Sequence, residues 1–303
     1  MWKLGAMLPS GTIGGEREDT RFVLGTLEET MFPSGHAENA TSARAKAWPA
    51  VVILGQPVAN VTEDQAVALI QSMIALGRPH HLVTVNPEFL VEARHNDTFR
   101  RVLQEADLPL ADGVGITVAA RLAGTPLQER IPGVDLLVRL ACESARRGWR
   151  PFFLGGAPGV ARRAAERLQR RWPALRVAGW YAGHPTPEET PAIIARVRRA
   201  APDLLFVAYG HPKQDLWIAR HKAALGVPVM MGVGGAFDYI AGVVPRAPAA
   251  MRRWGLEWLY RLYRQPWRWR RMLALPHFLA LVVFEVGVRR WHSGQRPHTH
   301  GHG

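Results

Sequence analysis

Short apolar stretches alternate with amphipathic segments along the chain from about Val51 onward. Between these stretches lie segments with apolar residues at helical spacing, such as GVARRAAERLQRRW at 159–172. Short apolar strands alternating with helices are typical of a mostly parallel sheet covered on both faces. We therefore predict an α/β fold, whose strand candidates are VVIL (51–54), HLVTV (81–85), PFFLGG (151–156), LRVAGWY (175–181), DLLFVAYG (203–210) and VPVMMGVGG (227–235).

Helix signals fill the spaces between the strand candidates. Thr62 and Gln65 have the spacing of a capping box, in which each side chain bonds the other residue's backbone, so a helix is expected to begin there. Helical segments are also expected between Pro87 and Ala106.

The pattern divides the chain into four parts. Residues 1–48 are rich in Gly, Ser, Thr and charge without a sustained period, which predicts a disordered leader. The α/β domain is expected at 49–245, followed by a basic, aromatic-rich helical appendage at 246–291. The His-rich tail at 292–303 is expected to be disordered rather than a metal site, because nothing nearby would orient its imidazoles.

Charge changes this picture most at the C-terminal end. The formal net charge is +13, which suggests a polyanionic partner such as nucleic acid, anionic lipid or a phosphorylated substrate. From Arg246 onward there are eleven arginines against two glutamates, so most of this excess lies in the appendage. The arginines alternate with Trp and Tyr, and an apolar run follows at 272–288. This run contains Pro276, His277 and Glu285, which favours contact with one membrane face over a transmembrane helix.

The sequence also bears on the compartment. The single cysteine, Cys142, cannot form an intramolecular disulfide, and its apolar helical context predicts a buried thiol. No sustained apolar run precedes Pro9, so no secretory signal is expected. We predict a cytoplasmic protein, peripheral on the inner face of the cell membrane.

Four clusters of small and polar residues follow predicted strands. They are Thr84-Val-Asn86-Pro, Ala111-Asp112-Gly113, Gly210-His-Pro-Lys-Gln214 and Gly232-Val-Gly-Gly-Ala-Phe-Asp238. Each alone is more typical of a turn or a helix cap. Ligands of parallel sheets bind beyond the carboxyl ends of the strands, so four clusters at one edge indicate a binding site.

A further glycine-rich turn, containing Gly155 and Gly156, has the strand, turn and helix order that holds phosphate through backbone N–H groups. It lacks the Gly-Lys-Ser/Thr of a Walker A loop, and no segment has the full dinucleotide-binding glycine pattern. A dehydrogenase is therefore poorly supported, whereas a nucleoside diphosphate ligand stays open.

Seven segments of the chain resemble the WecG/TagA/CpsF family of glycosyltransferases in order and approximate spacing, between about residues 50 and 280. These segments are TVNPEFLVEAR, LPLADGVGITVAARLAG, ERIPGVDLL, FFLGGAPGV, LLFVAYGHPKQDLWI, GVGGAFDYIAG and RAPAAMRRWGLEWLYRLYRQPWRWRR. The resemblance implies a Rossmann-like domain with a membrane-associating C-terminal appendage. It also implies inverting, metal-independent transfer from a UDP-sugar to an undecaprenyl-diphosphate-linked sugar.

No cofactor is expected, and the residues agree with a metal-free reaction on one point. The chain contains no Asp-x-Asp pair, which many glycosyltransferases use to hold the metal that neutralises the leaving diphosphate. The resemblance implies that Asp112 is the general base. It implies pocket positions for Thr84, Asn86, Arg130 and Gln214, a uridine contact for Asp238, and diphosphate-binding arginines at Arg261, Arg268 and Arg271.

Several alternatives stay open at this stage. Arg264 and Arg270 match the arginine spacing equally well, and any of these arginines could instead face solvent or lipid. Arginine interleaved with Trp and Tyr also suits nucleic acid, but the adjoining apolar run favours lipid. An inactive scaffold of polysaccharide assembly is disfavoured by the presence of Asp112. The family resemblance leaves N-acetylmannosamine, its uronic acid or glucose as the sugar, and the oligomeric state is undetermined. The Ala/Arg/Trp-rich composition favours an exopolysaccharide or an enterobacterial-type glycan over wall teichoic acid.

Overall fold

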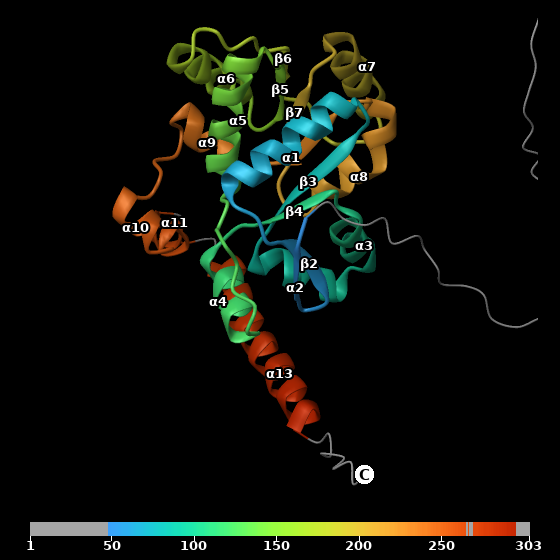
Figure 1. Cartoon of the computed structure of the whole chain (residues 1–303). Helices are drawn as coiled ribbons and strands as arrows, with labels where there is room; N and C mark the ends of the chain where they lie inside the picture. Colours follow the sequence, from blue (N-terminus) through green and yellow to red (C-terminus); the bar gives the residue numbers. More distant parts are fainter. Residues whose placement is uncertain (1–47, 265, 267–268, 295–303) are drawn as a thin grey trace, which may run out of the picture. The chain divides into compact units, whose positions relative to one another are not determined.

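A six-stranded parallel sheet forms the centre of the protein (Figure 1). The computed structural model describes residues 48–264, 266 and 269–294, with only the backbone for Arg261, Arg270, Arg271 and 289–294. Strand order is β4-β3-β8-β7-β5-β6, and every neighbouring pair is parallel. The strands are β3 (His80–Val85), β4 (Leu108–Ala111), β5 (Pro151–Gly155), β6 (Gly179–Tyr181), β7 (Leu204–Ala208) and β8 (Val229–Gly232). The predicted α/β fold is confirmed.

Helices cover both faces of the sheet, because its strands are apolar on both sides. One face carries α1 (Glu63–Leu76), α5 (Gly133–Arg147), α6 (Val160–Arg171) and α9 (Ala236–Ala241). The other face carries two groups of helices. Near β3 and β4 lie α2 (Pro87–His95), α3 (Asp97–Glu105) and α4 (Val114–Leu122). Near β5, β7 and β8 lie α7 (Thr190–Ala200) and α8 (Lys213–Leu225). In β3 the two faces alternate, with Leu82 in the first core and Val83 in the second.

The first apolar stretch lies outside the parallel sheet. β1 (Ala50–Ile53) pairs antiparallel with β2 (Gln56–Ala59) in a separate two-stranded sheet. Leu54 and Gly55 form the two-residue turn, with φ of 49° and 75°. Such a turn matches the twist of a hairpin. The sequence pattern did not anticipate this pairing, because β2 is only four residues long.

Local capping explains where the first helices begin. The capping box at Thr62 is confirmed, since Gln65 N–H donates to Thr62 Oγ1 at 3.2 Å and Thr62 N–H donates to Gln65 Oε1 at 2.9 Å. The helical region expected from Pro87 to Ala106 divides at Asn96 into α2 and α3. Asn96 accepts a hydrogen bond from Phe99 N–H at 3.0 Å and so caps α3.

The C-terminal region is helical, and its last helix is built into the core. It comprises α10 (Ala249–Arg253), α11 (Glu257–Arg264), α12 (Trp269–Met272) and α13 (Ala274–Gly294). α13 packs on α2 and α4, and its Phe278 and Val282 are buried in the same core as β3. Only part of the predicted apolar run is therefore available to a membrane. Within the ranges described, no helix has both the length and the hydropathy to cross a bilayer.

Two predicted segments fall almost wholly outside what the structure describes. The predicted leader at 1–48 and the tail at 292–303 lie almost entirely beyond the described ranges, and α13 continues to Gly294.

Cys142 in α5 is only half-buried, so the prediction of a buried thiol is wrong. Its helix places it at the margin of the core rather than inside it.

Candidate functional site

The four predicted clusters meet at one edge of the sheet. They follow β3, β4, β7 and β8, which occupy four consecutive places in the strand order. All four strands are parallel, so their carboxyl ends open on the same side. The tertiary structure thus brings together residues that lie up to about 150 positions apart in the chain.

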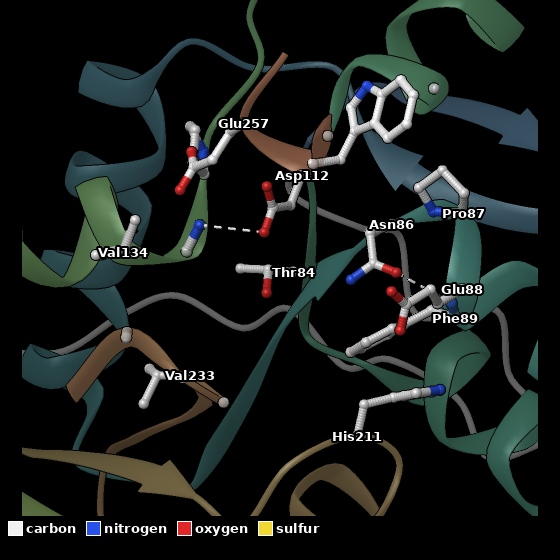
Figure 2. Close-up of a pocket in the computed structure, with 18 of the residues that line it drawn as sticks. Thr84, Asn86, Pro87, Glu88, Phe89, Asp112, Val134, His211, Val233 and Glu257 are labelled. Carbon is white, nitrogen blue, oxygen red and sulfur yellow. Dashed lines mark hydrogen bonds between the residues drawn. The ribbon is translucent and has the colours of Figure 1, made fainter. Parts of the chain in front are cut away.

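A cavity of about 320 Å³ lies at this edge (Figure 2). That volume is within the usual range for sites that hold small molecules. Its lining includes six of the predicted site residues, namely Thr84, Asn86, Asp112, Arg130, Gln214 and Asp238. Their chemical roles remain predictions, but they share one cavity.

Asp112 is held at the end of β4 by backbone contacts. Its own N–H donates to Val85 O at 2.8 Å, and its Oδ2 accepts a long hydrogen bond from Gly133 N–H at 3.4 Å (Figure 2). The next residue, Gly113, has a φ of +95°, which other residues rarely adopt. The chain therefore turns sharply after Asp112 and leaves its carboxylate at the cavity.

Thr84 and Asn86 come from the end of β3. Thr84 is buried, and a Cβ added at Gly133 would lie 3.2 Å from Thr84 Oγ1, so the start of α5 passes close to it. Asn86 also has the structural role that its position suggests, because its Oδ1 accepts from Phe89 N–H at 3.1 Å and caps α2. Figure 2 shows its amide nitrogen directed away from that bond. The helix-capping contact therefore leaves the nitrogen end of the amide as a donor.

Gln214 lies in the first turn of α8 and holds the loop after β8. Its Oε1 accepts from Gly234 N–H at 2.9 Å, and its side chain is 3% exposed. A Cβ on Gly232 would lie 2.6 Å from both Gln214 Nε2 and Asp215 Oδ1, so a larger residue there would displace these side chains. Beneath it, Asp215 Oδ1 lies 3.3 Å from His81 Nε2, both buried, which joins α8 to β3.

Arg130 lines the cavity and also contacts the C-terminal region. Its Nη2 donates to Arg252 O at 3.0 Å, at the end of α10. A guanidinium carries five N–H donors, so this bond leaves others for an anionic ligand. Asp238 lies in the first turn of α9, and it too lines the cavity.

The remaining predicted residues are placed differently. Gly155 ends β5 and Gly156 follows it, and neither lines the cavity. Tyr209 fills the space where a Gly155 side chain would be. Arg261 and Arg271 lie in α11 and α12 without described side chains, and Arg268 lies outside the described residues. The proposed phosphate roles of these five residues therefore stay predictions.

Comparison with known proteins gives the family. The glycosyl transferase WecG/TagA/CpsF family model matches residues 51–292, which is most of the chain. This chain belongs to the WecG/TagA/CpsF family. The predicted family assignment is thereby confirmed, and the family is one of glycosyltransferases.

Known proteins similar to this chain include three named N-acetylglucosaminyldiphosphoundecaprenol N-acetyl-β-D-mannosaminyltransferase. The protein from Bacillus spizizenii is 36% identical over 220 residues, covering 73% of this chain and 83% of its own. That from Bacillus subtilis is 34% identical over 218 residues, covering 71% and 84%. That from Staphylococcus aureus is 32% identical over 235 residues, covering 77% and 92%.

Sequence reasoning missed several residues that line the site of this WecG/TagA/CpsF protein. Glu257 and Trp258 reach it from α11. His211 belongs to a predicted cluster but had no assigned role; it lines the cavity and stacks on Phe89 with ring centroids 4.1 Å apart. Glu257 was visible as one of only two acidic residues in an arginine-rich segment. Its position at the cavity depends on how α11 folds back, and a local pattern does not contain that information.

Proposed function

We propose that this protein transfers a sugar, with inversion, from a UDP donor to a sugar linked through diphosphate to a polyprenyl lipid. The observation that carries the proposal is the convergence of Asp112, Thr84, Asn86, Arg130 and Gln214 on one cavity at the carboxyl edge of the sheet. The names of the relatives support it, since they state an N-acetylmannosaminyl transfer to N-acetylglucosaminyldiphosphoundecaprenol. N-acetylmannosamine is therefore the first candidate for the sugar.

Asp112 is the proposed general base. The hydroxyl oxygen of the acceptor sugar attacks the anomeric carbon of the donor, while its proton passes to the Asp112 carboxylate. The bond between the anomeric carbon and the β-phosphate oxygen breaks, and UDP leaves with the electron pair. The hydrogen bond from Gly133 N–H orients one carboxylate oxygen in the free protein. Thr84, Asn86 and Gln214 are the proposed partners of sugar hydroxyl groups.

The negative charge that develops on the leaving UDP needs a counter-charge. Arg130 lies at the cavity, and the arginine-rich appendage contributes other cavity-lining residues from α11 to α13. Guanidinium groups keep their charge and match phosphate oxygens in geometry. We propose that arginines, including Arg261, Arg268 and Arg271, supply this charge in place of a metal ion.

We expect transfer to survive treatment with EDTA. The chain has no Asp-x-Asp pair to hold a divalent ion, and arginines can stabilise the diphosphate without one. Initial rates should be measured after dialysis against EDTA, with and without added Mg²⁺ or Mn²⁺, alongside a metal-dependent glycosyltransferase as the positive control for chelation. Loss of activity that is restored by either ion would contradict the proposed mechanism.

The proposed site of action is the inner face of the cell membrane, where the appendage would contact anionic lipid. Its exposed side chains include large apolar groups, which are Trp254, Leu259, Tyr263, Trp269, Leu273, Val283 and Phe284. Arginines neighbouring such groups in sequence suit a lipid surface, because the apolar groups enter the interface while the cations meet phosphate head groups. The chemistry of the acceptor, a membrane lipid, supports the same location.

A donor screen tests the function directly. The full-length protein would be incubated with a short-chain lipid-diphosphate N-acetylglucosamine and, separately, with the UDP forms of N-acetylmannosamine, N-acetylmannosaminuronic acid, glucose and N-acetylglucosamine. We expect the N-acetylmannosamine donor to give the highest rate of UDP release and a product one sugar longer. A folded protein that neither transfers nor hydrolyses any of these donors would favour the inactive scaffold instead.

A further inference from the structure

Arg246 links two carboxylates that belong to different elements. It lies in the segment between α9 and α10, with its side chain 21% exposed. Its Nη1 and Nη2 donate to the two oxygens of Asp135 at 2.5 and 2.8 Å. Its Nε lies 3.6 Å from Glu257 Oε1, which is an ion pair beyond hydrogen-bond distance. One guanidinium thus joins α5 to α11.

The α5 end of this link adjoins the proposed general base. Asp135 lies in the first turn of α5, two residues after Gly133. Gly133 N–H is the donor to Asp112 Oδ2, and Gly133 itself lines the cavity. Asp135 and Gly133 lie in the same turn of α5, so a displacement of Asp135 would also move the N–H group that orients Asp112.

The α11 end of the link reaches the cavity directly. Glu257 is the first residue of α11, and its side chain is 14% exposed. Glu257 and Asp112 both line the cavity (Figure 2). A carboxylate at this place can accept hydrogen bonds from the hydroxyl or amide groups of a sugar.

Among the three linked side chains, Arg246 carries the positive charge that offsets the carboxylates of Asp135 and Glu257. Burial by itself lowers the pKa of its guanidinium, but Asp135 and Glu257 outweigh burial and raise that pKa. The group therefore stays charged between two carboxylates that would otherwise repel each other in a partly buried setting. Removing Arg246 takes away the cation that pairs with both Asp135 and Glu257. Neutralising Asp135 instead keeps the ion pair between Arg246 and Glu257.

We propose that Arg246 is a positioning residue that clasps α5 and α11 together and so holds the Glu257 carboxylate in the cavity. The inference about catalysis rests on the proposed function, but the clasp itself is a property of the fold. Two further contacts hold the C-terminal region on the domain. Arg130 donates a hydrogen bond to Arg252 O, and Gly255 packs against Val114. The clasp involves the Glu257 side chain directly, through its ion pair with Arg246.

The test compares Arg246→Ala, Arg246→Lys and the double variant Arg246→Ala with Asp135→Asn in the full-length protein. Amide hydrogen exchange in α11 should speed up about tenfold in Arg246→Ala, with kcat/KM reduced by a similar factor, as expected for loss of charged hydrogen bonds. Arg246→Lys keeps the charge and should fall between this variant and the parent. Adding Asp135→Asn removes one repelling charge and should restore part of both the protection and kcat/KM.

The matched control is Arg162→Ala on α6. Arg162 forms an exposed pair with Glu166 at 3.5 Å, so both readouts should stay at the parent value. Parent-like exchange in α11 of Arg246→Ala would overturn the clasp. Equal defects in the single and double variants would also overturn it, because charge compensation would then play no part. The exchange measurement requires no turnover, so it tests the clasp even if the donor screen shows that the proposed function is wrong.

Discussion

Replacing Asp112 by Asn should lower the rate of transfer by about 10² to 10⁴, the usual loss when a general base is removed. The amide has the same shape, and its oxygen can still accept the Gly133 N–H bond that orients the side chain. It cannot take up the proton of the acceptor hydroxyl. The fold and the affinity for UDP should therefore change little. Steady-state rates with the best donor, together with calorimetric titration of UDP, measure the two effects separately.

Asp97→Asn is the matched control for this substitution. Asp97 carries a 75% exposed side chain paired with Arg100 on α3, so the same chemical change there should leave the rate at the parent value. An Asp112→Asn protein that transfers within a factor of two of the parent would remove Asp112 from the mechanism. Loss of UDP binding in the same variant would point to a donor-binding role instead of proton transfer.

Phe278→Ala should destabilise the whole protein by about 3–5 kcal/mol, as truncation of a buried phenylalanine generally does. Phe278 is fully buried, and it packs in the core that also contains Val83 and Phe89. A loss of this size is a large part of the 5–15 kcal/mol that typically stabilises a domain. Thermal unfolding should shift down by roughly 10 °C. Deleting everything from Arg246 onward should likewise yield a destabilised domain, because the deletion uncovers this core.

Phe284→Ala separates anchoring from folding on the same helix. Phe284 is 72% exposed, so the free energy of unfolding should change by no more than about 0.5 kcal/mol. If its ring enters the lipid interface, partition onto vesicles of anionic phospholipid should weaken by about tenfold. Turnover of a water-soluble acceptor analogue should not change. Unaltered vesicle binding in Phe284→Ala would mean that this face of α13 does not contact lipid.

The alternation of apolar strands and amphipathic helices was enough to predict the parallel sheet, and the spacing of Thr62 and Gln65 was enough to predict the capping box. Both depend on local physics, namely burial on two faces and a side chain that satisfies backbone groups three residues away. The hairpin of β1 and β2 escaped prediction because two four-residue strands carry little periodic signal. Helical segments between Pro87 and Ala106 were predicted, but the position of their division at Asn96 was not, since a cap inside a helical pattern resembles any other polar residue.

For the candidate site, the sequence by itself indicated six residues that line the cavity, and the tertiary structure decided which side chains lie together there. Residues such as Thr84, Asp112 and Gln214 were recognisable because small and polar groups directly follow apolar strands, and the carboxyl ends of parallel strands share an edge. The contributions of Glu257 and Arg246, and the burial of Phe278, were not recognisable. They arise where α13 packs on α2 and α4 and where Arg246 pairs with Asp135 of α5. Such long-range contacts depend on side-chain fit and charge pairing between segments more than 100 residues apart.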